Sequence, residues 1–408
     1  MPKNLTPSHS RHALWASMAA LYLNGLLYAV WGVNIAVIRI RFDLSEGALS
    51  LALAAVAVGG IATMAMASRI VTRKGSRYTA MVSGLLMGGS ASFILVIPQF
   101  MPLLALLFVF GIFVAAHDIS VNTQVASLER LSGKPMIGAL HGSFSAGGLS
   151  GALLSSYWQG ASLPAETNFV VPAAAGAAVI LLTWRFMIPR EAESTSPGSE
   201  DASATGLAGE CHKGLRSRLL FLGLLAFSAL VVEGAFYDWA AVYMREVVQA
   251  PASWVGYGYA AFAVGLVSGR LSGDWIRARI AHQLLIAVGW IVAAGGLAAV
   301  LALRSPAEVV VGFFFTGLGI SNIIPLLFST AARLAVQGGM PASEGLAITT
   351  RIGYIGLLAG PLIVGPVAEF VGLRLSLLSL GIALSFTCAG WLLLSRRTAG
   401  KPWDISVA

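Results

Sequence analysis

Four charged side chains interrupt stretches of this chain that are otherwise almost entirely apolar: Asp118, Glu233, Asp238 and Arg351. A charge near the centre of a lipid bilayer costs about 2.5–3.5 kcal/mol, so each of them needs a partner, a water-filled cavity or a function. Asp118 has Asn122 one helical turn away on the same face, an arrangement that suits binding of a polar solute or of a proton. A structural hydrogen bond between helices is the alternative for Asp118.

The segment around Glu233 offers a second carboxylate with an aromatic companion. Tyr237 lies one turn further on the same helical face, whereas Asp238 points about 140° away on a helix with about 100° per residue. We expect Glu233 to bind substrate or a proton, and Asp238 to act as a gate or to pair with an arginine near the outer end. Arg351 would either bind a substrate anion or pair with a carboxylate, because an unpaired buried charge is costly.

Two histidines, His117 and His141, also lie inside apolar stretches. Imidazole titrates near neutral pH and therefore suits a proton relay, although a hydrogen-bonded packing role is the more common one. If Asp118, Glu233 and Asp238 were all ionised beside Arg351, the excess negative charge would favour proton uptake by at least one of these carboxylates. Asp118 and Glu233 are therefore our candidate proton-coupling residues, with the two histidines as relays.

Residues 12–40 place an amide and two aromatic rings on one helical face, at Asn24, Tyr28 and Trp31. Rings for stacking, together with amides such as Asn122 and Asn322, are what a small polar solute such as a sugar requires. We therefore assign these residues, with Tyr237 and Arg351, to substrate binding. A face that only packs against a neighbouring helix is the alternative for residues 12–40.

Long apolar stretches must position all of these side chains. Hydrophobic residues make up 57% of the 408 residues and charged residues 11%, with a mean hydropathy of +0.80. A helix needs roughly 20 apolar residues to cross about 30 Å of hydrocarbon, and the first stretch is too long for a signal peptide. This pattern predicts an all-α integral membrane protein with spans at 12–40, 47–69, 78–97, 102–127, 136–161, 168–188, 217–245, 252–276, 281–303, 307–334, 343–368 and 373–394.

One polar segment, residues 190–216, divides these spans six and six. Its serine, glycine, proline and acidic residues cannot bury enough apolar surface to fold, so we expect a cytoplasmic linker between helical bundles at 1–189 and 217–408. The halves resemble each other faintly. Glycine pairs in small-xxx-small spacing, which allows close helix contact, recur at Gly147 and Gly151 and at Gly356 and Gly360.

The net charge of +8 has a membrane explanation rather than a nucleic-acid one. Most of the 26 lysines and arginines lie in short loops on one predicted side of the membrane, and such a bias marks the cytoplasmic side. We therefore expect both termini in the cytoplasm of a bacterial cell, in its inner membrane, and no nucleic-acid partner.

Two basic loops, ASRIVTRKGSR and SGRLSGDWIRAR, resemble copies of a loop signature of the major facilitator superfamily. The copies depart from it at Thr72, where aspartate is usual, and at Trp275, where arginine is. The stretches AVWGVNIAVIRIRFDLSEGALSLALAA, HDISVNTQVASLERLSGKPMIGALHGSFSAGGLSG and EGAFYDWAAVYM resemble the YbjJ-like subgroup near the fucose-permease branch. The resemblance implies two pseudo-symmetric six-helix bundles, alternating access around a mid-membrane site, and gating roles for Arg69, Arg73, Arg270 and Asp274.

These features together predict a secondary active transporter for a small polar solute, coupled to protons by symport. A proton-driven efflux antiporter is the alternative; such antiporters typically carry Gly-Pro in the fifth span, whereas here Gly360-Pro361 lies in the eleventh. An intramembrane enzyme or a sensor is more remote, because no nucleophile elbow, HExxH, Walker loop or output domain is present. We expect no cofactor and no metal, and a monomer in the lipid bilayer.

Overall fold

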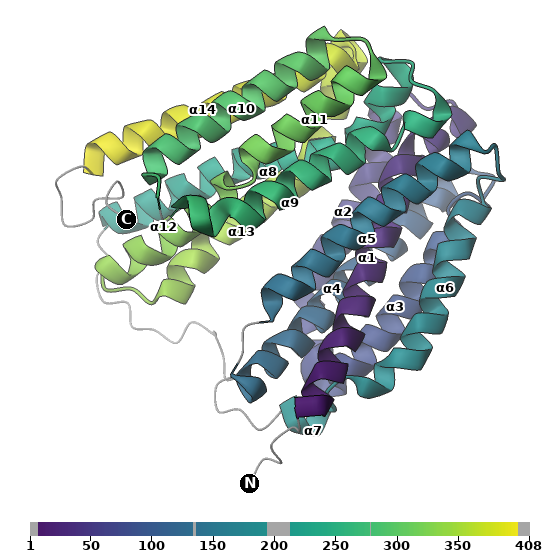
Figure 1. The fold of residues 1–408 in the computed structure, drawn as a ribbon, viewed down its shortest axis with the longest axis horizontal. Coiled ribbons are helices and arrows are strands. Elements are labelled where there is room, and N and C mark those ends of the chain that lie inside the picture. Colours follow the sequence, from purple (N-terminus) through teal and green to yellow (C-terminus); the bar gives the residue numbers. More distant parts are fainter. Residues whose placement is uncertain (1–6, 134–135, 194–212, 278, 399–408) are drawn as a thin grey trace. The chain divides into compact units, whose positions relative to one another are not determined.

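The computed structural model describes residues 7–133, 136–193, 213–277 and 279–398, and in this part of the chain all regular structure is helical (Figure 1). The predicted all-α membrane fold is confirmed. Eleven of the predicted spans each correspond to one α-helix and the tenth to two, and short 3-10 helices lie at the end of the sixth span (Trp184–Phe186) and at the start of the eighth (Ala252–Trp254). The helices are α1 (Pro7–Phe42), α2 (Glu46–Lys74), α3 (Ser76–Ser92), α4 (Phe100–Ser132), α5 (Ile137–Gly160), α6 (Thr167–Thr183), α7 (Arg190–Glu193), α8 (Lys213–Glu246), α9 (Tyr257–Arg277), α10 (His282–Ala302), α11 (Pro306–Ile320), α12 (Ile323–Gln337), α13 (Ala342–Val371) and α14 (Leu373–Thr398).

Hydropathy supports a membrane location for most of these helices. Within the described residues, nine segments are both long enough and apolar enough to cross a bilayer, among them 284–302, whose mean hydropathy of 2.4 is the highest of the nine. The segment 306–337 counts as one of the nine although a break interrupts it. Length and composition alone support these nine spans.

The tenth span is not one helix, contrary to the sequence prediction for 307–334. α11 ends at Ile320 and α12 begins at Ile323. Pro325 has no N–H to donate to the carbonyl of Ser321, and its ring crowds that carbonyl. The Ser321 hydroxyl donates to the carbonyl of Leu318 at 2.6 Å, and Asn322 donates its amide outward to another helix. Side-chain hydrogen bonds thus replace part of the backbone hydrogen bonding that is lost where the helix is interrupted.

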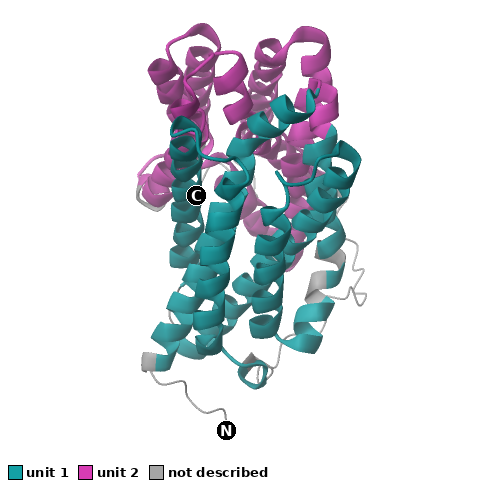
Figure 2. Cartoon of the chain, turned by 90° about the vertical axis from the view of Figure 1, so that its right-hand side faces the viewer, with its two compact units in different colours: residues 1–44, 51–205 teal, residues 45–50, 206–408 magenta. Residues whose placement is uncertain are grey.

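The chain divides into two compact units (Figure 2). Unit 1 comprises 1–44 and 51–205, and unit 2 comprises 45–50 and 206–408, so that the first residues of α2 group with unit 2. The linker expected at 190–216 falls largely on 194–212, which lie outside the described residues. Its last residues belong to α8, which begins at Lys213.

Glycines set the close helix contacts within each unit. A Cβ built on Gly147 would lie 2.0 Å from the carbonyl oxygen of Tyr22, and one on Gly151 would lie 2.3 Å from that of Leu26. Only a glycine lets α5 approach the backbone of α1 this closely. In unit 2, Gly356 and Gly360 bring α13 equally close to the backbone of α8. The close contacts predicted from the two glycine pairs are confirmed.

The same contacts reveal an internal repeat that is sharper than the sequence suggested. The glycines Gly25, Gly147 and Gly151 of unit 1 recur in unit 2 at one constant offset, at Gly234, Gly356 and Gly360, and all six make close backbone contacts. At that offset the sequence NGLLY on α1 corresponds to EGAFY on α8. Asn24 and Glu233 therefore occupy equivalent positions, as do Tyr28 and Tyr237.

Candidate functional site

Glu233 on α8 and Arg270 on α9 form an ion pair within unit 2. The Arg270 Nη2 donates to both carboxylate oxygens, Oε1 and Oε2, at 2.9 Å each. The Glu233 side chain is 9% exposed and the Arg270 side chain 42%. The pair thus joins a nearly buried anion to a cation that remains accessible. The loop signature predicts a gating role for Arg270, and the contact with Glu233 is one that the sequence does not predict.

Aromatic rings surround the α8 side of this pair. The ring of Tyr237 lies 5.2 Å from the ring of Tyr259, centroid to centroid, and 5.4 Å from that of Phe262, which it meets edge to face. Tyr237 also interacts electrostatically with both Glu233 and Arg270. The predicted placement of Glu233 and Tyr237 on one face of the helix is confirmed. Charge and aromatic surface of this kind can orient a polar solute by hydrogen bonds and stacking.

Asn322, in the break of the tenth span, supports the backbone of α9 beside Arg270. Its Nδ2 donates to the carbonyl of Gly269 at 2.9 Å. Its Oδ1 is buried without a hydrogen-bond partner among the described residues, and a Cβ built on Gly273 would lie 2.2 Å from it. The glycines at 269 and 273 therefore make room for the break, and Asn322 helps to hold α9 where Arg270 reaches Glu233. Direct substrate binding by Asn322 stays a prediction.

Arg351, on α13, is exposed and forms no ion pair with any residue that the structure describes. The alternative that it pairs with a carboxylate finds no partner among the described residues, where Glu233 pairs with Arg270 instead. Binding of a substrate anion by Arg351 stays a prediction. One turn further along α13, Tyr354 interacts electrostatically with Arg270. The sequence did not single out Tyr354, although its spacing from Arg351 places both on one face.

Asp238 is buried in unit 2, with 8% of its surface exposed. It forms no hydrogen bond or ion pair with a described residue, so the expected pairing with an arginine near the outer end is not formed. An ionised carboxylate without a partner would be costly here. The gating role predicted for Asp238 stays a prediction.

In unit 1, the position equivalent to Glu233 is filled by Asn24, which contacts α4. Its Nδ2 donates to the carbonyl of Val114 at 3.1 Å and to Nδ1 of His117 at 3.2 Å. Accepting at Nδ1 leaves the ring proton of His117 on Nε2, a buried atom that has no hydrogen-bond partner among the described residues. Asn24 and His117 are 1% and 0% exposed. Both repeats therefore use this position for a polar contact between neighbouring helices.

Asp118 and Asn122 are brought together on α4 as their spacing predicts. The Asn122 Nδ2 donates to the backbone carbonyl of Asp118 at 2.9 Å and to its carboxylate Oδ1 at 3.2 Å. In contrast to Glu233, Asp118 has no basic partner among the described residues. His141, on α5, is exposed.

The α1 face predicted to bind solute is largely buried. Trp31 is 1% exposed and packs its ring 6.4 Å from the ring of Phe110. Tyr28, between Asn24 and Trp31 on the same face, is only partly buried. Burial of Asn24 and Trp31 favours the packing alternative for these two and leaves Tyr28 as the ring best placed for a ligand.

The remaining predicted gate residues lie at helix ends. Arg69 and Arg73 are exposed in the last two turns of α2, and neither forms an ion pair within the part of the chain that the structure describes. The Asp274 side chain lies outside the described residues. The gating roles of these three residues stay predictions.

Paired long apolar helices, an internal repeat and buried charges in the spans define this protein as a polytopic membrane transporter. The model of the Major Facilitator Superfamily matches residues 13–340, and the chain belongs to that family. Its family and relatives indicate a transporter rather than an enzyme.

Relatives and solved structures agree with this assignment. The chain is 30% identical to the membrane protein MosC of Rhizobium meliloti, over 93% of this chain and 90% of that protein. It is 28% identical to an uncharacterized MFS-type transporter of Yersinia pestis, over 92% of each. Among solved structures it resembles a bacterial homolog of the human lysosomal transporter Spinster, with a TM-score of 0.73, 16% identity, and coverage of 96% and 98% of the two chains. The nucleoside transporter NupG gives a TM-score of 0.72 at 11% identity, covering 95% of this chain and all (100%) of that one.

Proposed function

We propose that this transporter couples the movement of a small polar solute to that of protons, and that Glu233 is the residue that carries the proton. The observation that carries the proposal is the ion pair between a carboxylate 9% exposed on α8 and a guanidinium 42% exposed on α9. Protonation of Glu233 removes the charge that holds Arg270. Protonation would release the pair and deprotonation would form it again, so that Arg270 would be free to bind solute only when Glu233 is protonated.

Glu233 suits this role better than Asp118, the other candidate. The oxygen atoms of Glu233 contact a cation, so a proton changes what the neighbouring helix is bonded to. Asp118 receives a hydrogen bond from a neutral amide on its own helix, and protonation there changes no contact between helices. A coupling residue must stabilise different arrangements in its two protonation states, and of the two candidates Glu233 is the one whose carboxylate pairs with a cation on a neighbouring helix.

The solute that fits the surroundings of the pair is small and rich in hydroxyl groups. Tyr237, Tyr259 and Phe262 offer ring faces and edges next to a carboxylate and a guanidinium. Sugars and nucleosides combine a stackable face with hydroxyl groups that such charges bind. The fold neighbour named for nucleoside transport makes nucleosides and related sugars the first compounds to test.

We further propose symport by alternating access in a monomer. The basic loops suggest the orientation, with both termini in the cytoplasm of a bacterial cell and the protein in its inner membrane. Arg69 and Arg73 at the end of α2 would face the cytoplasm in this orientation. Membership of the subgroup near the fucose-permease branch is proposed on the same sequence features.

A ligand screen is the first experiment. The purified protein is heated with sugars, sugar acids, nucleosides, amino acids and cationic drugs, because a ligand that binds only the folded state raises the apparent melting temperature. A sugar or nucleoside that raises the melting temperature of wild type should raise the melting temperature of Tyr237→Ala by less. A shift produced by cationic drugs alone would overturn the small-polar-solute proposal in favour of efflux.

The coupling experiment uses the ligand found in the screen. Glu233→Gln and Asp118→Asn are compared in proteoliposomes for accumulation driven by a proton gradient and for counterflow, which needs no net proton movement. Glu233→Gln should lose accumulation and keep counterflow, while Asp118→Asn should keep both. Accumulation by Glu233→Gln at the wild-type rate, or loss of accumulation in Asp118→Asn alone, would show that Glu233 is not the proton carrier.

A further inference from the structure

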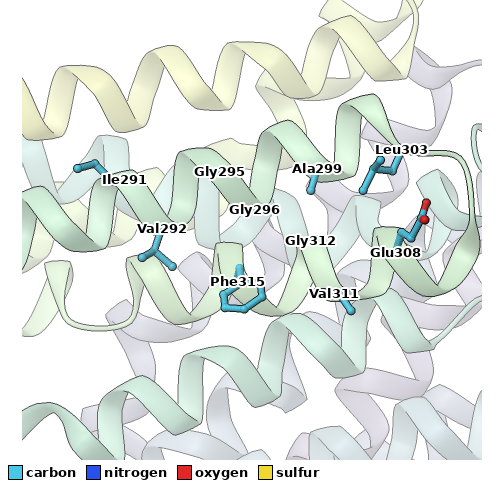
Figure 3. A pocket seen from close by; sticks show the side chains of 10 residues that line it. All are labelled: Ile291, Val292, Gly295, Gly296, Ala299, Leu303, Glu308, Val311, Gly312 and Phe315. Carbon is cyan, nitrogen blue, oxygen red and sulfur yellow. The ribbon is translucent and has the colours of Figure 1, made fainter.

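A groove runs between α10 and α11 of unit 2 (Figure 3), and none of its lining residues is among those assigned above to transport. Its volume is about 390 Å³, within the range of roughly 300–1,000 Å³ that ligand sites occupy. α10 and α11 pack closely along the groove. The exposed helical glycine Gly295 lines the groove together with Ile291 and Phe315. Apart from one carboxylate, every lining residue is apolar.

The groove has the length of half a bilayer. On α10 its lining runs from Ile291 to Leu303, about 18 Å for a helix that rises about 1.5 Å per residue. The hydrocarbon core of a membrane is about 30 Å thick, so one acyl chain that enters from the headgroup region reaches about this far. A ligand that is apolar along its length and polar at one end fits such a groove.

Charged groups lie only at the end of the groove where both helices meet the loop. Glu308 lines the groove in the first turn of α11, and Arg304 lies in the turn that joins α10 to α11. Both side chains are exposed, and neither forms an ion pair with a residue that the structure describes. A first-turn glutamate also complements the helix dipole. The dipole does not account for an apolar groove that ends beside this glutamate.

We propose that the groove binds one acyl chain of an aminophospholipid such as phosphatidylethanolamine. The ammonium group of the lipid would pair with Glu308 and its phosphate with Arg304. A carboxylate at the mouth of the groove selects against lipids such as phosphatidylglycerol, which carry a net negative charge and no cation. This ligand is independent of the transported solute and of the Glu233 site.

Two kinds of glycine in the groove decide which substitution tests the proposal. A Cβ on Gly296 would lie 2.4 Å from the backbone nitrogen of Thr316, and one on Gly312 would lie 2.9 Å from the carbonyl oxygen of Gly296. These two hold the helices together and cannot be enlarged without moving them. Gly295 has no atom within 4 Å of a built Cβ. A leucine at position 295 would therefore fill the groove and leave the helix contact intact.

The test is native mass spectrometry of the protein released from nanodiscs that contain equal amounts of phosphatidylethanolamine and phosphatidylglycerol. Wild type should retain one phosphatidylethanolamine, and Gly295→Leu should lose it. Phe315→Ala, which removes a lining ring without filling the groove, should weaken retention. Glu308→Gln should keep a lipid but lose a roughly fivefold preference for phosphatidylethanolamine, the size expected for one charge at a membrane surface.

Matched controls come from the same chain. Gly89 on α3 is also an exposed helical glycine with no atom within 4 Å of a built Cβ, and Glu344 is an exposed glutamate in the first turn of α13. Gly89→Leu and Glu344→Gln should both behave as wild type. Three results would overturn the proposal. Wild type could retain no lipid, Gly295→Leu could retain as much lipid as wild type, or the preference for phosphatidylethanolamine could be the same in wild type and in Glu308→Gln. Wild type that appears as a dimer, with Gly295→Leu a monomer, would assign the groove to a second copy instead.

Discussion

Breaking the ion pair between Glu233 and Arg270 should destabilise unit 2 unequally, depending on which partner is removed. Arg270→Gln leaves a carboxylate that is 9% exposed without its cation, whereas Glu233→Gln leaves a guanidinium that is 42% exposed. Removal of one partner from a buried pair costs about 3–5 kcal/mol, and exposed pairs contribute about 0.2–1 kcal/mol. We expect a loss of about 3 kcal/mol for Arg270→Gln, about 1–2 kcal/mol for Glu233→Gln, and a coupling energy of about 1–2 kcal/mol between them.

The measurement is a double-mutant cycle on the free energy of unfolding. Purified wild type, both single variants and the double variant are unfolded in mixed micelles of increasing SDS content and followed by tryptophan fluorescence. Arg216 lies on α8 about 25 Å from Glu233 along the helix, so Arg216→Gln combined with Glu233→Gln should be additive. A coupling energy below about 0.5 kcal/mol for the 233–270 cycle, or equal losses in the two single variants, would refute the reasoning.

Three further predictions concern packing and the unpaired carboxyl. Gly234→Ala should lower the free energy of unfolding by about 1–3 kcal/mol, since its Cβ would lie 2.2 Å from the carbonyl oxygen of Leu357. Gly295→Ala should leave the free energy of unfolding unchanged or raise it by up to about 1 kcal/mol. Equal effects of the two variants in SDS unfolding would contradict the close contact at Gly234. Asp238→Asn keeps the shape of a buried carboxyl that has no described partner, so we expect an unchanged or raised melting temperature, and a fall like that of Glu233→Gln would reveal a partner. Asn24→Ala should lower stability by about 1–3 kcal/mol through its lost bonds to α4 and leave ligand affinity by calorimetry unchanged; weaker binding with unchanged melting would instead place Asn24 in the substrate site.

The sequence predicts whatever depends on a single helix. Bilayer-length apolar runs locate the spans because a helix of fixed rise must cross a hydrocarbon core of fixed thickness. Helical periodicity likewise places Tyr237 beside Glu233 and Asn122 beside Asp118. Even the break in the tenth span has a cause visible in the sequence, because Pro325 cannot continue the hydrogen bonding of the helix.

Contacts between helices are what the sequence does not predict. The partner of Glu233 is Arg270 rather than Arg351. The rotation of α9 relative to α8 determines which basic side chain lies within reach of the Glu233 carboxylate. That rotation depends on glycine contacts and on the Asn322 amide, which binds the backbone of α9. The constant offset between the NGLLY and EGAFY segments was available in the sequence. Aligning the two segments would have marked Asn24 and Glu233 as equivalent before any contact was known.

The central claim is that Glu233 carries the coupled proton, and proton flux tests it most directly. Proteoliposomes loaded with a pH-sensitive dye receive the ligand from the thermal screen, and internal pH is followed as solute enters. Wild type should acidify the interior with each addition of solute. Glu233→Gln should exchange labelled solute at a rate comparable to wild type without acidification. Acidification by Glu233→Gln equal to that of wild type would contradict the account.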